Sequence, residues 1–353
     1  MSTRPRDHSP RLRGALVLMP LPVLAFGSGP RAVRAGGAAT GAPGMTGWFA
    51  MRPRSSDSSA DALVAMSADG DAVDGDDAPR PEPSPFSFSL NYALYSDYVF
   101  RGINFSEFSR EGREKPNHQL TTTVSVDLGP LFGDPPASWG TLSFSSFFEW
   151  FAAQKSLDPI HGGQNLQEVD YSLSWSYDVA PINTSLSIGY TFYTFPHFKR
   201  NDTSEWSVAL DHNDAWMWRW MAPDNTDPVL SPHFVFVQDV DIANGGSWME
   251  LGLSHDFALT PDVTLTPGIT FAVDHRWMDP ILGTGRNGTT RLAFIQYGLT
   301  VTYDLSGAMH MPVHAGDVAV SGFIYFSDAT SGAEDDGVIQ DEFYGGMSIE
   351  WTF

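Results

Sequence analysis

From Phe86 to Phe353, apolar and polar residues alternate along the chain with a period of two. The stretch 169–179, VDYSLSWSYDV, is representative: its odd-numbered positions are Val, Tyr, Leu or Trp, and its even-numbered positions are Ser or Asp. Alternate side chains of a β-strand point to opposite faces of a sheet. The pattern therefore predicts strands that have one apolar face and one polar face.

Twelve such strands are expected, and short connections containing Pro or Gly alternate with longer polar ones. The strands span 86–101, 119–128, 138–151, 168–179, 184–195, 203–211, 232–241, 247–257, 263–276, 290–305, 317–327 and 342–353. An even number of strands of ~10 residues, with turns at one rim and loops at the other, is typical of outer-membrane barrels. We therefore predict an all-β fold, a 12-stranded antiparallel transmembrane β-barrel.

A soluble β-sandwich is the alternative, because its strands also alternate. A sandwich carries a highly charged exterior, whereas the polar face here consists mainly of Ser, Thr, Gly and scattered acidic residues, with very little Lys. The apolar face carries aromatic residues near strand ends, where membrane barrels have their interfacial girdles. These residues are Trp150, Tyr190, Tyr303 and Trp351. Their placement favours the membrane barrel.

The last strand ends on an aromatic residue. Met347, Ile349, Trp351 and Phe353 occupy every second position there, and a terminal aromatic on an amphipathic strand is the usual assembly signal of outer-membrane proteins. We assign these four residues to that signal. The expected partners are the barrel-assembly machinery, outer-membrane lipid and lipopolysaccharide, and the expected location is the outer membrane of a Gram-negative bacterium.

The region before the barrel has a different composition. In residues 1–35, four arginines precede an apolar run at 14–26 and small residues follow, which is the order of a secretory signal peptide. Cleavage after Ala35 and cleavage after Gly27 both fit. Residues 36–85 are rich in Gly, Ala, Ser, Asp and Pro, so we expect a disordered linker. The predicted barrel domain is then 86–353.

Charge and composition narrow the functions. The chain carries 20 Lys and Arg against 42 Asp and Glu, for a net charge of −22. Because residues 1–85 contain nine of each sign, the whole excess lies in the barrel region. Such a balance disfavours nucleic acid as a partner. The absence of Cys excludes disulfides, thiolate zinc sites and iron–sulfur clusters, and we expect no cofactor.

The segment 96–103, SDYVFRGI, resembles the first-strand motif of the TorF-type (Gcw_chp) porin family. The resemblance extends over roughly residues 86–353, and SDYVFRG is its distinctive part. Less specific fragments of the same pattern lie at 168–171, 204–206, 239–241, 248–252 and 255–257. The resemblance implies an outer-membrane barrel with a porin function.

The polar face of the predicted barrel carries twelve acidic residues against two arginines. Ten of these acids and both arginines are the candidate pore-lining residues: Asp97, Arg101, Asp127, Glu149, Asp170, Glu205, Asp239, Asp241, Glu250, Asp274, Arg276 and Glu350. A lumen lined by one sign of charge attracts the opposite sign. We therefore expect a passive channel for small solutes that favours cations. Because the first and last strands of a closed barrel are neighbours, we also expect Arg101 to pair with Glu350.

The sequence also allows two other functional interpretations. The first is a closed structural barrel, or a receptor that binds a partner through its loops. Its best support is the stretch 211–231, in which Trp216, Trp218 and Trp220 alternate, although membrane anchoring also explains those aromatics. The second, less favoured, is an outer-membrane lipid hydrolase. Such an enzyme needs a Ser–His pair, and no His-x-Ser-Asn-Gly cluster occurs. We expect no enzyme activity, no catalytic residue and no metal site.

Overall fold

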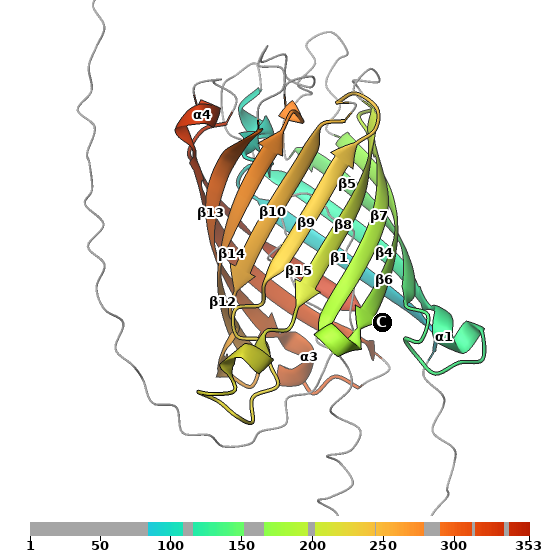
Figure 1. Cartoon of the computed structure of the whole chain (residues 1–353). Helices are drawn as coiled ribbons and strands as arrows, with labels where there is room; N and C mark the ends of the chain where they lie inside the picture. Colours follow the sequence, from blue (N-terminus) through green and yellow to red (C-terminus); the bar gives the residue numbers. More distant parts are fainter. Residues whose placement is uncertain are drawn as a thin grey trace, which may run out of the picture. The chain divides into compact units, whose positions relative to one another are not determined.

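The computed structural model describes residues 84–108, 116–151, 166–196, 202–243, 245–278, 290–312, 315–334 and 339–353. These residues form a closed antiparallel β-barrel with its turns (Figure 1). The predicted signal peptide at 1–35 lies outside the described residues. So does the predicted linker at 36–85, apart from its last two residues.

Twelve strands make the wall of the barrel. They are β1 (Phe86–Tyr95), β4 (Asn117–Asp127), β5 (Thr141–Phe151), β6 (Leu166–Val179), β7 (Thr184–Thr194), β8 (Thr203–His212), β9 (His233–Asp239), β10 (Ser247–Ser254), β12 (Val263–His275), β13 (Thr290–Asp304), β14 (Asp317–Ala329) and β15 (Glu342–Thr352). Successive wall strands pair with one another, and β1 pairs with β15 to close the ring. The short strand β11 (Phe257–Thr260) follows β10 and also pairs with β12. The prediction of twelve antiparallel strands is confirmed.

One predicted boundary is wrong. The first strand was expected to run to Arg101, but β1 ends at Tyr95. The N–H of Ser96 makes a last wall contact with the carbonyl of Gly345, at 2.8 Å. Beyond it the chain turns inward and forms two short strands, β2 (Val99–Phe100) and β3 (Ile103–Asn104), which pair with each other instead of with the wall.

The two faces of the wall have the predicted character. On β6, Tyr171 and Leu173 are 44% and 51% exposed on the outer face, whereas Ser172 between them is 6% exposed on the inner face. Ser172 shares a hydrogen bond of 2.8 Å with Thr191 of β7. Similar hydroxyl pairs link Thr123 with Ser145 and Ser125 with Ser143. The outside is thus apolar, and the inside is lined by small hydroxyl side chains.

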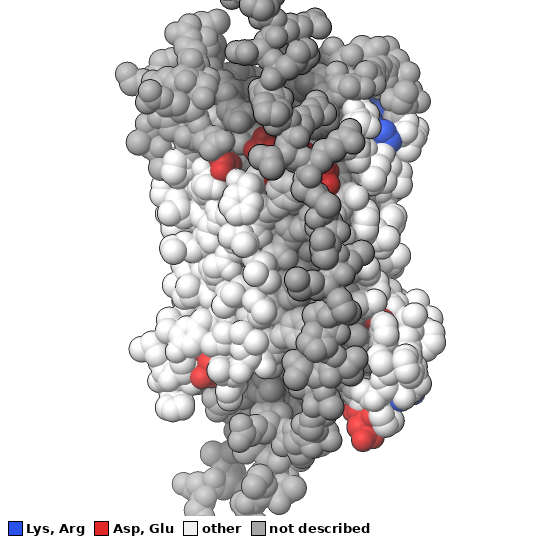
Figure 2. Space-filling model, turned by 90° about the vertical axis from the view of Figure 1, so that its left-hand side faces the viewer, with Lys and Arg blue, Asp and Glu red and all other residues white. Residues whose placement is uncertain are grey.

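An apolar exterior and a closed sheet fit a lipid bilayer, where no backbone group is left without a partner. In the side view of Figure 2, the described surface shows an uncharged band across the middle, with Asp and Glu near the two rims. The barrel is an outer-membrane protein. Among the described residues, no helix is long and apolar enough to cross a membrane.

The closing seam involves the predicted assembly signal. The N–H of Phe88 donates to the carbonyl of Phe353 at 2.7 Å, and the N–H of Phe353 donates to the carbonyl of Phe88 at 2.8 Å. Met347, Ile349, Trp351 and Phe353 are all exposed, as expected for a lipid-facing row. Their role in assembly remains a prediction.

The start of β1 and the end of β15 lie at the same rim, which we call the periplasmic rim (Figure 1). Short helical turns lie at the connections on this rim: α1 (Leu128–Leu131), η2 (Ala180–Ile182), η3 (Ala215–Trp218) and α3 (Leu305–Ala308). The opposite rim carries η1 (Phe105–Phe108) and α4 (Ser331–Glu334). The predicted alternation between the two rims therefore places the stretch 211–231 on the periplasmic side.

That stretch is a folded loop built around Asp214. The carboxylate of Asp214 accepts hydrogen bonds from Trp218 Nε1, at 2.7 Å, and from the backbone N–H groups of Val229, Leu230 and Ser231. Burial alone would raise the pKa of Asp214, but these hydrogen bonds to the charged form lower it. Trp216 and Trp220 remain exposed, so their proposed anchoring role stays a prediction.

The outer face can be tested with Leu173, which lies at the centre of β6. Leu173→Arg should lower the free energy of unfolding from lipid by about 2–4 kcal/mol, because a charge near the bilayer midplane loses its hydration. Leu131→Arg is the matched control, since Leu131 is also 51% exposed but belongs to the periplasmic turn α1. Equal costs for the two variants, measured by equilibrium denaturation from bilayers, would contradict the assigned membrane band.

Candidate functional site

The inside of the barrel holds a short hairpin, which we call the lumen hairpin and define as residues 96–106. Tyr98, Val99, Phe100 and Ile103 are all buried. Tyr98, Phe100 and Ile103 belong to one cluster of buried apolar side chains, and Val99 belongs to a second. The N–H of Tyr98 donates to Ser106 Oγ at 2.7 Å, which ties the two ends of the hairpin together. Part of the lumen is therefore filled by the chain itself.

The turn of the hairpin is conformationally demanding. Arg101 and Gly102 have φ values of +50° and +77°, in the left-handed region that side chains with a Cβ rarely adopt. A Cβ on Gly102 would lie 2.7 Å from Phe294 Cδ1 and 3.1 Å from Ile339 Cγ2. Glycine is thus required both by the backbone conformation and by the closeness of the wall.

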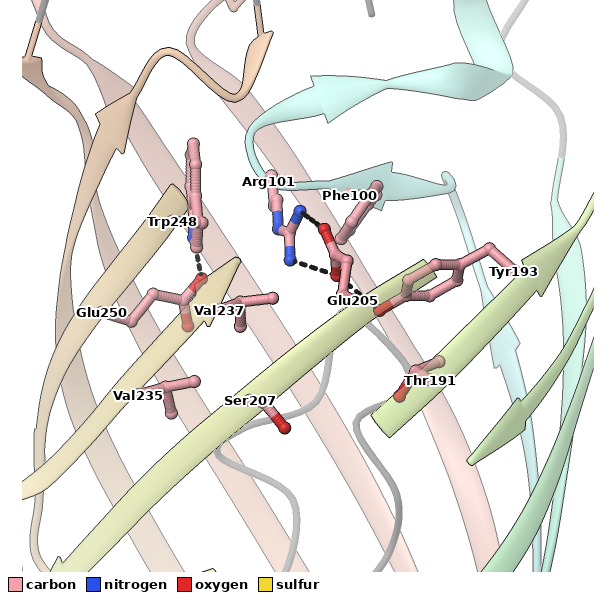
Figure 3. A pocket seen from close by; sticks show the side chains of 10 residues that line it. All are labelled: Phe100, Arg101, Thr191, Tyr193, Glu205, Ser207, Val235, Val237, Trp248 and Glu250. Carbon is pink, nitrogen blue, oxygen red and sulfur yellow. Dashed lines mark hydrogen bonds and ion pairs between the residues drawn. The ribbon is translucent and has the colours of Figure 1, made fainter. Parts of the chain in front are cut away.

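The tip of the hairpin carries Arg101 into a buried ion pair with Glu205 of β8. Arg101 Nη1 lies 2.6 Å from Glu205 Oε1, and Nη2 lies 2.9 Å from Oε2 (Figure 3). Glu205 also accepts hydrogen bonds from the hydroxyl of Tyr193, at 2.8 Å, and from Trp277 Nε1, at 2.6 Å. A two-pronged bond between guanidinium and carboxylate is among the strongest polar contacts in proteins. It fixes the hairpin to the wall.

Aromatic rings surround the same guanidinium group. Its central carbon lies 4.1 Å from the ring centre of Trp277, 4.7 Å from Phe100 and 5.6 Å from Trp248. A cation over an aromatic face is attracted to it, and the attraction grows when water is excluded. We call this arrangement the arginine box. Its walls are Phe100, Tyr193, Glu205, Trp248, Glu250 and Trp277, and its occupant is Arg101.

Further carboxylates face the lumen beside the hairpin. Glu149 of β5 and Glu168 of β6 are directly opposite each other in the strand pairing. Glu168 accepts a hydrogen bond from the hydroxyl of Tyr98 in the hairpin. Glu149 and Asp170 are both buried, and neither oxygen of Glu149 has a hydrogen-bond partner. A buried carboxylate of this kind is costly to ionise, so it contributes negative charge where water or a cation reaches it.

Several predicted pore-lining residues face the interior from the wall strands. They are Glu149, Asp170, Glu205, Glu250, Asp274 and Glu350. Asp274 also accepts hydrogen bonds from the N–H of Trp277 and from Arg291 Nε, so it partly serves to hold the loop that carries Trp277. These residues occupy the positions that the alternation predicts.

The other predicted pore-lining residues lie at strand ends, in loops or in the hairpin. Asp127 ends β4 and accepts hydrogen bonds from the N–H groups of Gly129 and Ala137. Asp239 ends β9 directly opposite Glu205, on the same inner face. It accepts hydrogen bonds from Thr203 and from two N–H groups of its own loop. The remaining four are in loops or in the hairpin: Asp241 and Arg276 are exposed in loops, while Asp97 and Arg101 lie in the lumen hairpin.

The expected pairing of Arg101 with Glu350 is wrong. In the seam, Glu350 lies opposite Asn91 of β1. Because β1 ends at Tyr95, the chain carries Arg101 away from the seam and across the lumen to Glu205. Its partner Glu205 lies on β8, which is separated from β1 by the four wall strands β4, β5, β6 and β7.

Four residues that complete the arginine box were not predicted from the sequence: Phe100, Tyr193, Trp248 and Trp277. The alternation does place Tyr193 on the polar face of its strand with Thr191, and Trp248 on that of Glu250. It gives no sign that these aromatics meet around one cation, and it does not apply to Trp277, which follows β12. A local signal for the hairpin was present: Ser96 and Asp97 are turn-forming residues, and Gly102 interrupts the predicted strand.

The described residues contain no group of three His, Asp or Glu side chains arranged to hold a metal ion. A His–carboxylate contact lies near the periplasmic rim, where His233 Nδ1 is 2.7 Å from Asp211 Oδ1. The buried polar groups that converge within the lumen are those of the hairpin and its surroundings. We therefore take the arginine box and the neighbouring carboxylates as the candidate functional site.

Comparisons with known proteins give one family match and several distant structural resemblances. Residues 80–271 match a family model described as "Bacterial protein of unknown function (Gcw_chp)". No curated protein matches the chain. Among solved structures, an outer-membrane channel from Pseudomonas putida F1 is 9% identical, with a TM-score of 0.43 over 77% of this chain and 96% of that one.

Two further solved structures resemble the chain at a similar level. The KdgM porin is 9% identical, with a TM-score of 0.37 over 76% of this chain and 99% of the porin. Outer-membrane phospholipase A from Escherichia coli is 13% identical, with a TM-score of 0.36 over 79% of this chain and 94% of the phospholipase.

The fit of the hairpin can be tested at Gly102. Gly102→Ala should destabilise the folded barrel by about 1–3 kcal/mol, because the added methyl group meets Phe294 and the positive φ disfavours a Cβ. Gly322→Ala on β14 is the control, since a Cβ there meets no atom within 4 Å. The measurement is the denaturation midpoint of each variant, and equal midpoints would refute a tightly docked turn.

Proposed function

The chain belongs to the Gcw_chp family of bacterial proteins of unknown function, and we propose that it is a porin-like channel for small solutes that favours cations. The expected surroundings are outer-membrane lipid and lipopolysaccharide, with the barrel-assembly machinery as the partner during insertion. The proposal includes no catalytic step.

One observation carries the proposal: acidic groups outnumber basic groups around the lumen hairpin. Glu149, Glu168, Asp170, Glu205 and Glu250 face this section of the lumen. Arg101 lies among them, and its positive charge is neutralised by the ion pair with Glu205. A water-filled path beside these carboxylates would have a negative potential, which raises the local concentration of cations and lowers that of anions.

The lumen hairpin sets the width of the path. Beside the arginine box the structure leaves a cavity of about 20 Å³, which is room for about one water molecule. Toward the periplasmic rim the lumen is lined by small hydroxyl side chains such as Ser125, Ser143 and Ser172. Because the docked hairpin fills part of the lumen, we regard it as the element that controls the aperture.

A closed structural or receptor barrel is the second candidate. The observation that favours it is the tight docking of the hairpin, with its buried ion pair and its apolar packing. A permanently docked hairpin would block the lumen at this section. The two candidates therefore differ in whether current crosses the reconstituted barrel.

Selectivity provides the first test. In a planar bilayer under a KCl gradient, the wild-type barrel should give discrete current steps with a cation-selective reversal potential. The double variant Glu149→Gln, Asp170→Asn should move that potential toward zero, because it removes two lumen charges while leaving the Arg101–Glu205 pair intact. Asp328→Asn, an exposed carboxylate on β14, is the control and should change nothing. An unchanged potential in the double variant would refute the acidic filter.

The aperture provides the second test. Arg101→Gln should raise the single-channel conductance, because the hairpin loses its ion pair with Glu205. It should also cost about 3–5 kcal/mol of stability, since Glu205 is left buried and unpaired. Adding Glu205→Gln should restore part of that stability while keeping the conductance high. If neither the wild type nor these variants conduct any current, the closed structural barrel is favoured.

A further inference from the structure

We propose that the arginine box is a receptor site for solutes that carry a guanidinium group, and that Arg101 is its resident occupant. The inference rests on the proposed channel function. A solute guanidinium would take the place of Arg101, and the freed hairpin would widen the lumen for that class of solute.

All the walls of the box except Phe100 lie outside the hairpin that carries the occupant. Tyr193 lies on β7, Glu205 on β8, and Trp248 and Glu250 on β10, while Trp277 follows β12. These groups are held by the wall, whose geometry is fixed by strand pairing. Arg101 and Phe100 belong to the hairpin. If the hairpin withdraws, most of the site stays in place, so the site is organised before a ligand arrives.

The walls match the chemistry of guanidinium in particular. Glu205 presents both carboxylate oxygens to a planar fork of N–H donors, at 2.6 and 2.9 Å. Tyr193 and Trp277 donate to those same oxygens and so fix their direction. The rings of Trp248 and Trp277 flank the cation. A carboxylate that can accept two parallel N–H groups, together with flat aromatic faces, favours guanidinium over the compact, strongly hydrated ammonium group.

A second carboxyl group lies in the box beside Glu205. Glu250 accepts a hydrogen bond of 2.6 Å from Trp248 Nε1. Both Glu205 and Glu250 line the small cavity shown in Figure 3. A solute cation that reaches this cavity therefore meets a second acceptor group besides Glu205.

The resident occupant is held under strain. Arg101 is a non-glycine residue at a φ of +50°, and strained backbone of this kind gathers at ligand clamps and switch regions. Exchange of Arg101 for a free guanidinium keeps the contacts of the box and relieves the strain. The tether still favours Arg101, because short linkers give effective concentrations of about millimolar. Solutes should therefore compete at millimolar levels and above.

A unique thiol can report on withdrawal of the hairpin. The chain contains no Cys, and Val99 in the hairpin is 2% exposed. Val99→Cys in the membrane-inserted full chain should react slowly with a water-soluble thiol reagent. Millimolar methylguanidinium should accelerate the reaction about tenfold in a saturable way, as the withdrawn population rises in proportion. Methylurea has a similar planar shape without the charge and should have no effect.

Matched variants identify the site. With Glu205→Gln added, Val99→Cys should react rapidly with or without methylguanidinium, whereas with Glu350→Gln added it should behave like its parent. Ile103→Cys, at 0% exposure, provides a second reporter position if Val99→Cys fails to give a heat-modifiable folded barrel. A labelling rate that methylguanidinium leaves unchanged, or that methylurea raises equally, would overturn the proposal.

Labelling and conduction separate this inference from the channel itself. If the barrel passes cations while labelling ignores methylguanidinium, the receptor site is refuted and the channel stands. If methylguanidinium accelerates labelling but no current crosses any form of the barrel, the receptor site is supported and the channel is refuted.

Discussion

The structure depends on the pairing between β1 and β15. Within a bilayer there is no water to satisfy backbone N–H and C=O groups, so a sheet that crosses the membrane must have no free edge. The register from Ser89 opposite Thr352 to Tyr95 opposite Gly346 removes the two edges that this chain would otherwise expose. Once the ring is closed, the apolar residues of each strand face the lipid, and the polar residues that alternate with them face the lumen.

Closure also creates the conditions in which the lumen charges matter. Charges enclosed by a low-dielectric wall interact more strongly than charges on a wet surface. Arg101 and Glu205 satisfy each other there, while neither oxygen of Glu149 has a hydrogen-bond partner. The same enclosure that makes the ion pair strong makes an unpaired carboxylate costly to ionise unless water or a cation reaches it. The docking of the hairpin and the behaviour of the lumen carboxyl groups therefore both depend on the closed wall.

The sequence predicted the wall far better than the site, for a physical reason. The faces of β6 follow from residues two positions apart, so a local pattern specifies them, and the same holds for all twelve strands. Arg101 and Glu205 are 104 residues apart, and no local period encodes their meeting. The inward turn after Tyr95 did leave a local trace in Ser96, Asp97 and Gly102. Trp248 shares the face of Glu250 on β10, but nothing local indicates that it meets Trp277, which follows β12 outside any strand.

The lumen hairpin continues directly from β1, the strand at which the barrel closes. The segment that fills the lumen is therefore adjacent in the chain to a strand that seals the wall. A hairpin that remained outside while β15 joined β1 would afterwards have to carry a charged arginine and several aromatic rings through the mouth of a finished barrel. Because the hairpin adjoins β1, the sheet can instead curl around the hairpin before β15 pairs with β1 and closes the barrel.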